Sequence, residues 1–438
     1  QALGEDVGPT PPLHVRGEAE LPSCYRVTDL AVASMGAAMT ELAGLIGARQ
    51  VALDRRLASL WFDMTLQPMG WELPSPWDPI AGVYRAADGW IRLHTNAPHH
   101  RDAALSVLAV QAERQAITEK VSVWQKTELE TAVVKAGGAA AAMHSVQEWK
   151  AHPQGRAVMR EPLIAWQRRE GVARRSDLED IKVLDLTRVL AGPVATRFLA
   201  GFGACVLRID PPSWNEPGVE PEVTLGKTCA GLDLTQTTDR QKFEALLSEA
   251  DLLIHGYRPG ALDALGYDRA FIQRHAPHLI DVSLCAYGWS GPWATRRGFD
   301  SLVQMSCGIA DEGMSRTRAQ KPVPLPVQAL DHATGYLMAA AALRALRLRA
   351  ATGQVSSARL SLARTAALLM SVAPRDMTGA PPIVEDGDLA PDPEVTAWGP
   401  ARRIAFPASV DGRGPHWRTP AGPLRSSEPT WACASRAP

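Results

Sequence analysis

The chain has 438 residues, of which 46% are hydrophobic and 21% charged, with 46 lysines and arginines against 47 acidic residues. This composition is ordinary for a globular protein and excludes wholesale disorder and fibrous repeats. The net charge of −1 gives no general reason to expect nucleic acid or an acidic membrane surface as a partner. The length favours two domains or one elaborated α/β unit.

The cysteines and the N-terminal segment indicate the cellular compartment in which we expect the protein. No apolar run approaches the ~18 residues that span a bilayer, and residues 1–20 lack the basic-then-apolar build of a signal peptide. The cysteines show no short paired spacing, so we expect neither a disulfide framework nor a cysteine zinc site. These residues are Cys24, Cys205, Cys229, Cys285, Cys307 and Cys433. We therefore expect a reduced, cytoplasmic protein with no membrane partner.

The first part of the chain predicts a loose leader over residues 1–20 and a mixed helix and strand segment over 21–165. Small and apolar residues at helical spacing predict a helix over 28–46. Two short alternating runs around Asp88-Gly89 predict a β-hairpin, which is the strongest local signal here. The remaining expectations are a strand or helix over 51–62, an irregular stretch over 68–79 and helices over 101–150.

A segment dense in arginine and acids, residues 166–180, is our candidate linker. Beyond it, IKVLDL (181–186), a turn at AGP (191–193), a helix and CVLRID (205–210) form a βαβ opening. Such an opening implies a parallel sheet with crossover helices. The fold class we expect is α/β, with a doubly wound, Rossmann-like domain over 181–375, a smaller α+β domain before it and a closing segment over 376–438. Further predicted elements are a helix over 239–250 and strands over 251–255 and 278–284.

Two stretches of the chain resemble each other. TDLAVASMGAAMTELAGLIG (28–47) is similar to LDHATGYLMAAAALRALRLR (330–349), which places Asp29 on Asp331. Similar runs follow both, at 51–62 and 357–368. Because alanine-rich helices resemble one another by chance, duplication and coincidence both stay open.

The residues that carry possible chemistry lie near predicted strand ends. The first βα turn lacks G-x-G-x-x-G, so a nicotinamide or flavin loses its main support. Arg258, in the glycine-rich turn after a strand, offers a fork for phosphate, and Lys227 offers a second cation. Asp210 ends a strand, where a solvated acid is favoured over a ribose contact. HTNAPHH (94–100) favours a polar loop over a metal site, because no cluster of acids or cysteines is near.

Asp331 stands at a predicted loop-to-helix junction. An aspartate there is most often an N-cap that binds free helix amides. The same environment would hold a carboxylate ionised and ready to act as a nucleophile. Neither role is excluded by the position alone.

Four segments then occur together in the order and spacing of family III CoA-transferases, the CaiB/BaiF group that includes α-methylacyl-CoA racemase. They are the 181–212 opening, GYRPGALDALGYD, YGWSGPWATRRGFDSLVQMSCG and LDHATGYLMAAAAL. The first 170 residues resemble the second half of this family and residues 398–417 its closing stretch. The chain thus resembles the family with its parts in altered order, as in a truncated tandem duplication.

The resemblance implies an enzyme that moves CoA from an acyl-CoA donor to a small carboxylic acid through an aspartyl-CoA intermediate on Asp331. It places CoA contacts at Arg208, Lys227, Gly256, Tyr257 and Arg258. Near the reacting carbonyl it places Val189, Ala191 and Gly192. It implies no permanently bound cofactor and no metal, with CoA as substrate, and a homodimer of interlocked subunits without nucleic acid.

The chain departs from the family at several positions. Formyl-CoA transferase has a glutamine where this chain has Leu190, a lysine near Cys285 and a glycine before the nucleophile where Leu330 stands. Its glycine-rich loop is not recognisable here, so we do not carry over oxalate or formate. Two alternatives follow: a racemase-like isomerase, disfavoured because Phe299 replaces the histidine of the G-x-D segment, and a non-catalytic CoA-binding homologue.

Overall fold

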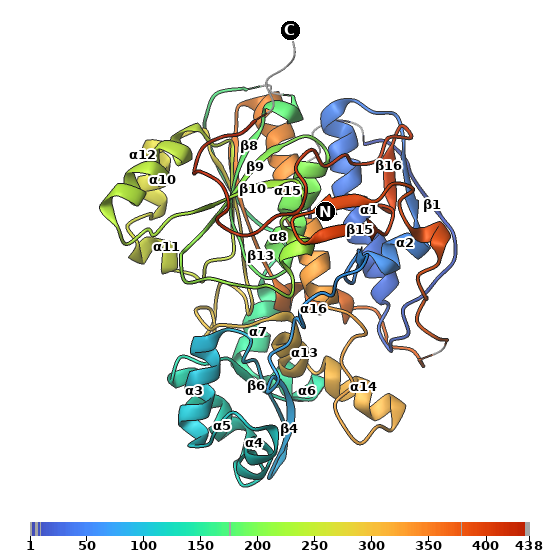
Figure 1. The fold of residues 1–438 in the computed structure, drawn as a ribbon, viewed down its shortest axis with the longest axis vertical. Coiled ribbons are helices and arrows are strands. Elements are labelled where there is room, and N and C mark those ends of the chain that lie inside the picture. The colour runs from blue at the N-terminus through green and yellow to red at the C-terminus, as the bar shows by residue number, and fades with distance from the viewer. Residues whose placement is uncertain (1, 5–7, 9, 175–176, 378, 434–438) are drawn as a thin grey trace.

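The computed structural model describes residues 2–4, 8, 10–174, 177–377 and 379–433. Its main element is a seven-stranded sheet in the order β10-β9-β8-β11-β12-β13-β7 (Figure 1). Every neighbouring pair is parallel except β13 with β7. The strands are β7 (Ala165–Arg169), β8 (Lys182–Leu186), β9 (Cys205–Asp210), β10 (Lys227–Gly231), β11 (Leu252–His255), β12 (Ile280–Cys285) and β13 (Val355–Ser361). The order confirms the predicted doubly wound α/β fold.

Helices cover both faces of this sheet (Figure 1). On one face Phe243 and Leu246 pack with Leu184, Leu207 and neighbouring strand residues. On the other face the long α15 and α8 pack on the sheet and on each other. The helices are α8 (Ala191–Gly201), α9 (Glu220–Val223), α10 (Thr237–Glu249), α11 (Ala261–Ala264), α12 (Arg269–His275), α13 (Asp300–Ser306), α14 (Ile309–Thr317), α15 (Ala329–Thr352) and α16 (Leu362–Leu369).

The N-terminal part of the chain is joined to this body. Strand β7 completes the main sheet, so the expected linker of residues 166–180 is partly a strand, and its residues 175–176 lie outside the described part. Its charged side chains are compatible with the half-buried edge that β7 occupies. β2 pairs with β1 and β16, and β3 with β15, which ties the closing segment to the first 70 residues. These elements are β1 (Leu13–Arg16), α1 (Val27–Ile46), β2 (Val51–Asp54), α2 (Arg55–Leu60), β3 (Leu66–Pro68), β14 (Glu394–Thr396), β15 (Gly399–Arg403) and β16 (Ala408–Val410), with short 3-10 turns at Leu178–Asp180 and Asp386–Asp388.

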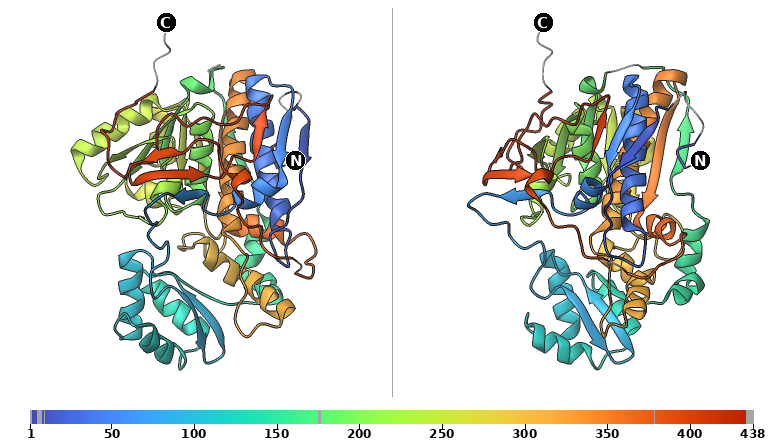
Figure 2. Two further views of the ribbon diagram at one scale, coloured as in Figure 1. Left: turned by 45° about the vertical axis from the view of Figure 1, so that its right-hand side comes forward. Right: turned by 90° about the vertical axis from the view of Figure 1, so that its right-hand side faces the viewer.

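A small module, residues 82–142, lies at one end of the molecule (Figure 2). The predicted hairpin is confirmed, with Ala86 opposite Gly89 and β6 as the third strand. Trp90 and Met143 pack against Leu302 and Met305 of α13, which fixes the module on the body. Its elements are β4 (Gly82–Ala86), β5 (Gly89–Leu93), α3 (Pro98–Leu108), α4 (Arg114–Val121), α5 (Lys126–Lys135) and β6 (Ala140–Ala142); α6 (Val146–Ala151) and α7 (Pro153–Arg160) lead back to the sheet.

The two similar stretches adopt the same helix–strand–helix order. α1, β2 and α2 correspond to α15, β13 and α16, and α1 packs along α15. Asp54 caps α2 and Ser361 caps α16, each by accepting a hydrogen bond from a backbone amide three residues on. This correspondence favours the duplication over coincidence. Asp29 does not share the setting of Asp331, because it lies half-exposed and is paired with Arg55 at 2.7 Å.

α1 is also long and apolar enough to cross a membrane by length and composition, which corrects the expectation of no such run. An 18-residue stretch of this helix has a mean hydropathy of 1.3, and 56% of it is buried. Small residues such as Ala31 and Ala38 raise the hydropathy and also permit the close packing of α1 on the body. A buried core helix passes the same test, and α1 has that setting.

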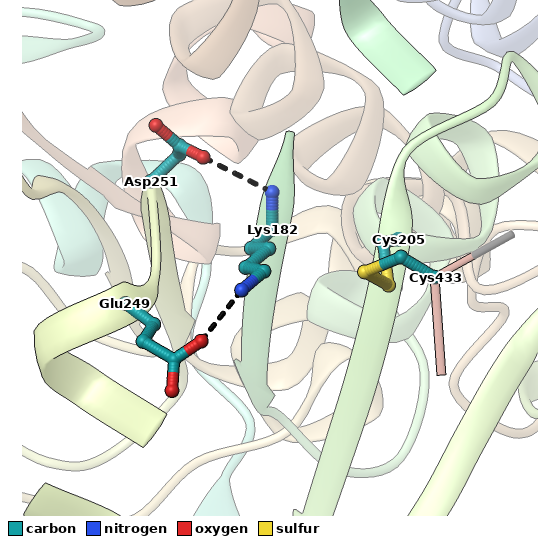
Figure 3. The surroundings of a disulfide bond; sticks show 5 residues. All are labelled: Lys182, Cys205, Glu249, Asp251 and Cys433. Atoms are coloured by element: carbon teal, nitrogen blue, oxygen red, sulfur yellow. Dashed lines mark hydrogen bonds and ion pairs between the residues drawn. A yellow bond between two sulfur atoms is a disulfide. The ribbon is translucent and has the colours of Figure 1, made fainter. Parts of the chain in front are cut away.

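One expectation about the cysteines is wrong. Cys205, at the start of β9, forms a disulfide with Cys433, 228 residues further on (Figure 3). Spacing in the sequence could not reveal this pair, because the closing segment must first cross the sheet-bearing part to bring Cys433 to β9. The other cysteines are unpaired and buried.

Candidate functional site

Two adjoining cavities open at the carboxyl ends of the parallel strands. They lie where the strand order reverses between β8 and β11, the usual ligand position in doubly wound sheets. The arginine cavity, about 990 Å³, is lined by Arg188, Arg258, Arg296 and Arg297, among others. The apolar cavity, about 630 Å³, has a largely aromatic and aliphatic lining. Asp331 lines both cavities.

Asp331 is held in place by a second carboxyl group. The Asp300 carboxylate accepts the backbone amides of Leu330 and Asp331, at 2.8 and 3.0 Å, and Gln304 donates to its other oxygen. These amides belong to the first turn of α15, where no intrahelical partner exists. Asp300 therefore satisfies the helix amides from another helix. The reading of Asp331 as an N-cap is wrong, since its own side chain makes no cap bond.

The close approach of α8 and α15 brings Asp331 near the first crossover helix. A Cβ atom on Gly335 would lie 2.3 Å from the carbonyl oxygen of Ala191 and 2.8 Å from the side chain of Val194. No larger residue fits there without a shift of one helix. The first turn of α8, with Ala191 and Gly192, consequently lines the same cavity as Asp331.

Both carboxyl groups have a raised pKa. Burial, followed by the charge of Asp300, raises the pKa of Asp331 well above its usual range. Burial raises the pKa of Asp300 to about 6, against the lowering effect of its hydrogen bonds. We expected the helix N-terminus to hold Asp331 ionised. That expectation is wrong in direction, because desolvation and a like charge outweigh the helix terminus.

The loop after β8 contains a residue in a strained backbone conformation, which a hydrogen bond to Glu216 stabilises. Val189, a β-branched residue, has a φ of 66°, a region that such residues rarely adopt. Its amide donates to Glu216 at 2.8 Å, and Glu216 also accepts from Trp214 and from Arg208. Arg208 is fully buried and also binds Asp210 at 2.8 Å. Asp210 is thus a buried ion-pair partner, and not the solvated acid we favoured.

Lys227 supports the same loop through its ion pair with Asp185. It is buried and lies 3.0 Å from Asp185. Asp185 in turn accepts from Thr187 and Thr196, at 2.5 and 2.6 Å. Neither Lys227 nor Arg208 lines a cavity. We therefore replace the expected CoA contacts of these two residues by a positioning role, because both cations are buried away from the cavities and paired with carboxylates.

The other expected contacts do gather around the arginine cavity: Val189, Ala191, Gly192, Gly256, Tyr257 and Arg258 line it. Arg188 lies over the rings of Trp214 and Tyr257, at 5.0 and 5.4 Å from their centroids. Within the described residues no carboxylate lies within salt-bridge distance of the guanidinium groups of Arg188, Arg258 and Arg297. Sequence reasoning missed Arg188 and Arg297, although the first βα turn and the TRRGFD stretch contained them.

Two histidines of the apolar cavity are neutral. Burial lowers the pKa of both His94 and His332 to about 3. His94 stacks on Phe299 with ring centroids 3.7 Å apart. The expected loop is present over residues 94–97 and leads into α3, with His94 buried and Asn96 exposed. Across the described residues no group of three or more His, Cys, Asp or Glu side chains has the arrangement of a metal site.

Comparison with known proteins identifies part of the chain. A sequence model of CoA-transferase family III matches residues 178–392. The acetyl-coenzyme A transferase nodX of Hypoxylon pulicicidum is 32% identical over 210 residues, which cover 47% of this chain and 33% of that protein. A probable fatty acyl-CoA transferase of Mycobacterium tuberculosis is 33% identical over 190 residues, covering 40% of this chain and 48% of that protein.

Human succinyl-CoA:glutarate CoA-transferase is 31% identical over 190 residues, covering 40% of this chain and 43% of that protein. The chain thus spans between a third and about half of the length of these relatives. A solved CAIB/BAIF family protein from Brucella suis aligns over 51% of this chain and 65% of its own, with a TM-score of 0.40 and 25% identity. Through its residues 178–392, the chain belongs to CoA-transferase family III.

Proposed function

We propose that this chain transfers CoA between an acyl-CoA and a carboxylic acid through a covalent intermediate on Asp331. The observation that carries the proposal is the place of Asp331 on the wall between the two cavities. One cavity offers cations for the CoA phosphates and the other offers an apolar chamber for the acyl group. A carboxyl group between them meets the thioester carbonyl that joins these two parts.

The charges of the arginine cavity fit the CoA end of the substrate. Coenzyme A carries a pyrophosphate and a ribose phosphate, and arginine binds such groups with paired donors. Burial and, to a smaller extent, the neighbouring charge of Arg258 lower the pKa of Arg297, so these two guanidinium groups repel each other. A bound phosphate would relieve this repulsion. Arg188, which lies over two aromatic rings, lines the same cavity.

The transfer proceeds through four acyl exchanges in which every bond broken is replaced. The ionised Asp331 attacks the thioester carbonyl, the C–S bond breaks, and CoA leaves as thiolate from a mixed anhydride. The thiolate attacks the aspartyl carbonyl, which releases the donor acid and leaves an aspartyl-CoA thioester. The acceptor carboxylate attacks that thioester and expels the thiolate again. The thiolate then attacks the acceptor's acyl carbon, so that acyl-CoA leaves and Asp331 regains its carboxylate.

The first turn of α8 and Asp300 have supporting parts in this scheme. The amides that open α8 at Ala191 and Gly192 point along a helix N-terminus into the cavity, where an oxyanion would be stabilised. Asp300 holds the backbone of Asp331 and also raises its pKa, so that the carboxylate, once ionised, is poorly solvated and reactive. No metal is required for any step.

Intact-protein mass spectrometry after incubation with a panel of acyl-CoAs tests the proposal. We expect a CoA-sized adduct on the unaltered chain that is absent from Asp331→Asn, with CoA binding retained. Hydroxylamine should remove the adduct, because it cleaves thioesters. No adduct with any donor would contradict the proposal. Exchange of the α-proton of the acyl group without an adduct would support the racemase-like alternative, and CoA binding alone the non-catalytic one.

We also propose that the chain works as a homodimer in the cytoplasm. The support is the resemblance of its segments to a family with interlocked subunits and the composition described above. Sedimentation velocity of the chain over a range of concentrations tests the dimer, and a monomer at all concentrations would contradict it.

A further inference from the structure

We infer that the apolar cavity selects an uncharged, bulky monocarboxylic acyl group and excludes dicarboxylic ones. This inference deepens the proposed function and rests on it. The family match alone does not decide the acyl group, whereas the walls of this cavity restrict which acyl groups fit. Its volume of about 630 Å³ lies within the range of cavities that enclose a complete small ligand.

The lining of the cavity is apolar on most sides. Aromatic and aliphatic side chains come from several separate parts of the chain, including the segment before the small module and the segment before α15. The principal ones are Phe62, Met64, Trp77, Trp214, Phe299 and Val327. A wall of this kind stabilises an acyl group by burying its apolar surface, at about 25 cal/mol per Å².

No lysine or arginine lines this cavity among the described residues. Of the guanidinium groups around it, Arg208 binds Glu216 and Arg101 lies 3.5 Å from Asp78. Arg188 lies over the Trp214 ring but lines only the arginine cavity. Arg92 lies over the Trp77 ring, 4.9 Å from its centroid, and does not reach the lining. A second carboxylate on the substrate would thus find no cation in the cavity.

Some of the acidic residues that line this cavity are paired with arginines, and others are not. Asp78 and Glu216 are compensated by the arginines named above, and Asp63 is exposed to solvent. Asp300 and Asp331 remain, and a substrate carboxylate near them would meet like charge. The two histidines add no positive charge, because burial lowers their pKa to about 3. The apolar cavity therefore accepts an uncharged acyl group without an electrostatic cost and repels an anionic one.

The test compares acyl donors of similar size that differ in charge. The rate of CoA-adduct formation on the chain is measured with 3-phenylpropanoyl-CoA, hexanoyl-CoA and glutaryl-CoA. The terminal carboxylate of the glutaryl group takes the place of the terminal ethyl group of the hexanoyl group. We expect the two uncharged donors to react about 100-fold faster or more than glutaryl-CoA, because an unpaired buried charge costs several kcal/mol. A donor with a quaternary ammonium group, 4-(trimethylammonio)butanoyl-CoA, completes the series.

A charge-adding variant sharpens the comparison. Met64 is half-buried in the wall, so Met64→Lys places an ammonium group there, and Met64→Gln provides a polar control of similar length. Met64→Lys should improve the glutaryl rate relative to the hexanoyl rate by about tenfold or more, and Met64→Gln should not.

The possible results separate this inference from the proposed function. Equal rates for glutaryl-CoA and hexanoyl-CoA, or a preference for the cationic donor, would overturn the inference while the adduct on Asp331 upheld the transferase. An adduct with none of the donors would overturn the proposed function, and the inference with it. A gain for glutaryl-CoA in Met64→Gln as large as in Met64→Lys would show that charge is not the cause.

Discussion

Replacing Asp300 by asparagine tests the account of the paired carboxyl groups. In the folded chain the pKa of Asp300 is about 6, against an ordinary value of 3.8, because the group is buried. Between these two values the unfolded chain loses this proton while the folded chain keeps it. The free energy of unfolding therefore falls as pH rises through this window, by about 3 kcal/mol in total. Asparagine, which does not ionise, removes this loss.

The free energy of unfolding of Asp300→Asn, relative to that of the original chain, should accordingly increase as pH rises. Near pH 4 both side chains are neutral, and Asp300→Asn costs about 1 kcal/mol for an altered bond to Gln304. At pH 8 the removed ionisation penalty of about 3 kcal/mol dominates, so the variant should be more stable by about 2 kcal/mol. The variant also removes the repulsion between the charges of Asp300 and Asp331, which further increases its relative stability at pH 8. Urea unfolding followed by tryptophan fluorescence at both pH values measures the change. An equal effect at pH 4 and pH 8 would refute the reasoning.

Three further predictions rest on other parts of the structure. Gly335→Ala should lower the free energy of unfolding by about 1–3 kcal/mol, because its Cβ would meet the Ala191 carbonyl. Gly387→Ala, which has open space around its Cβ, should change the free energy of unfolding little, and equal effects of the two variants in denaturant unfolding would contradict the prediction. Arg297→Ala should weaken CoA binding about tenfold and reduce its salt dependence, whereas Lys120→Ala on the exposed face of α4 should not, as measured by calorimetry. Denatured, unreduced protein should take up four alkylating groups and reduced protein six, because one pair is a disulfide; six without reduction would contradict the pairing.

Local patterns in the sequence predicted the main sheet and the hairpin. The apolar runs at 181–186 and 205–210 and the turn at Asp88-Gly89 have short-range signatures, and β8, β9, β4 and β5 form there. β7 escaped prediction because its arginines are not typical of a strand. Its place depends on an edge offered by β13, nearly 190 residues further on.

The site was only partly predictable for the same reason. Asp331 and Arg258 stand in segments with a family resemblance, and both line the arginine cavity. Lys227 and Arg208 stand in such segments as well, but their roles depend on Asp185 and Glu216, which the fold brings within ion-pair distance. The pKa of Asp331 was misjudged because burial and the nearness of Asp300 are properties of the folded chain.

The most direct test of the central claim follows oxygen atoms through the reaction. The acyl-CoA that labels the chain is incubated with its own acid carrying ¹⁸O in the carboxylate, and the peptide that contains Asp331 is then weighed. In the proposed scheme the acid attacks the aspartyl thioester and leaves one of its oxygens in the restored carboxylate. The account predicts a gain of about 2 Da at Asp331 after one turnover. Exchange of CoA between labelled and unlabelled acid without ¹⁸O at Asp331 would contradict a covalent role for this residue.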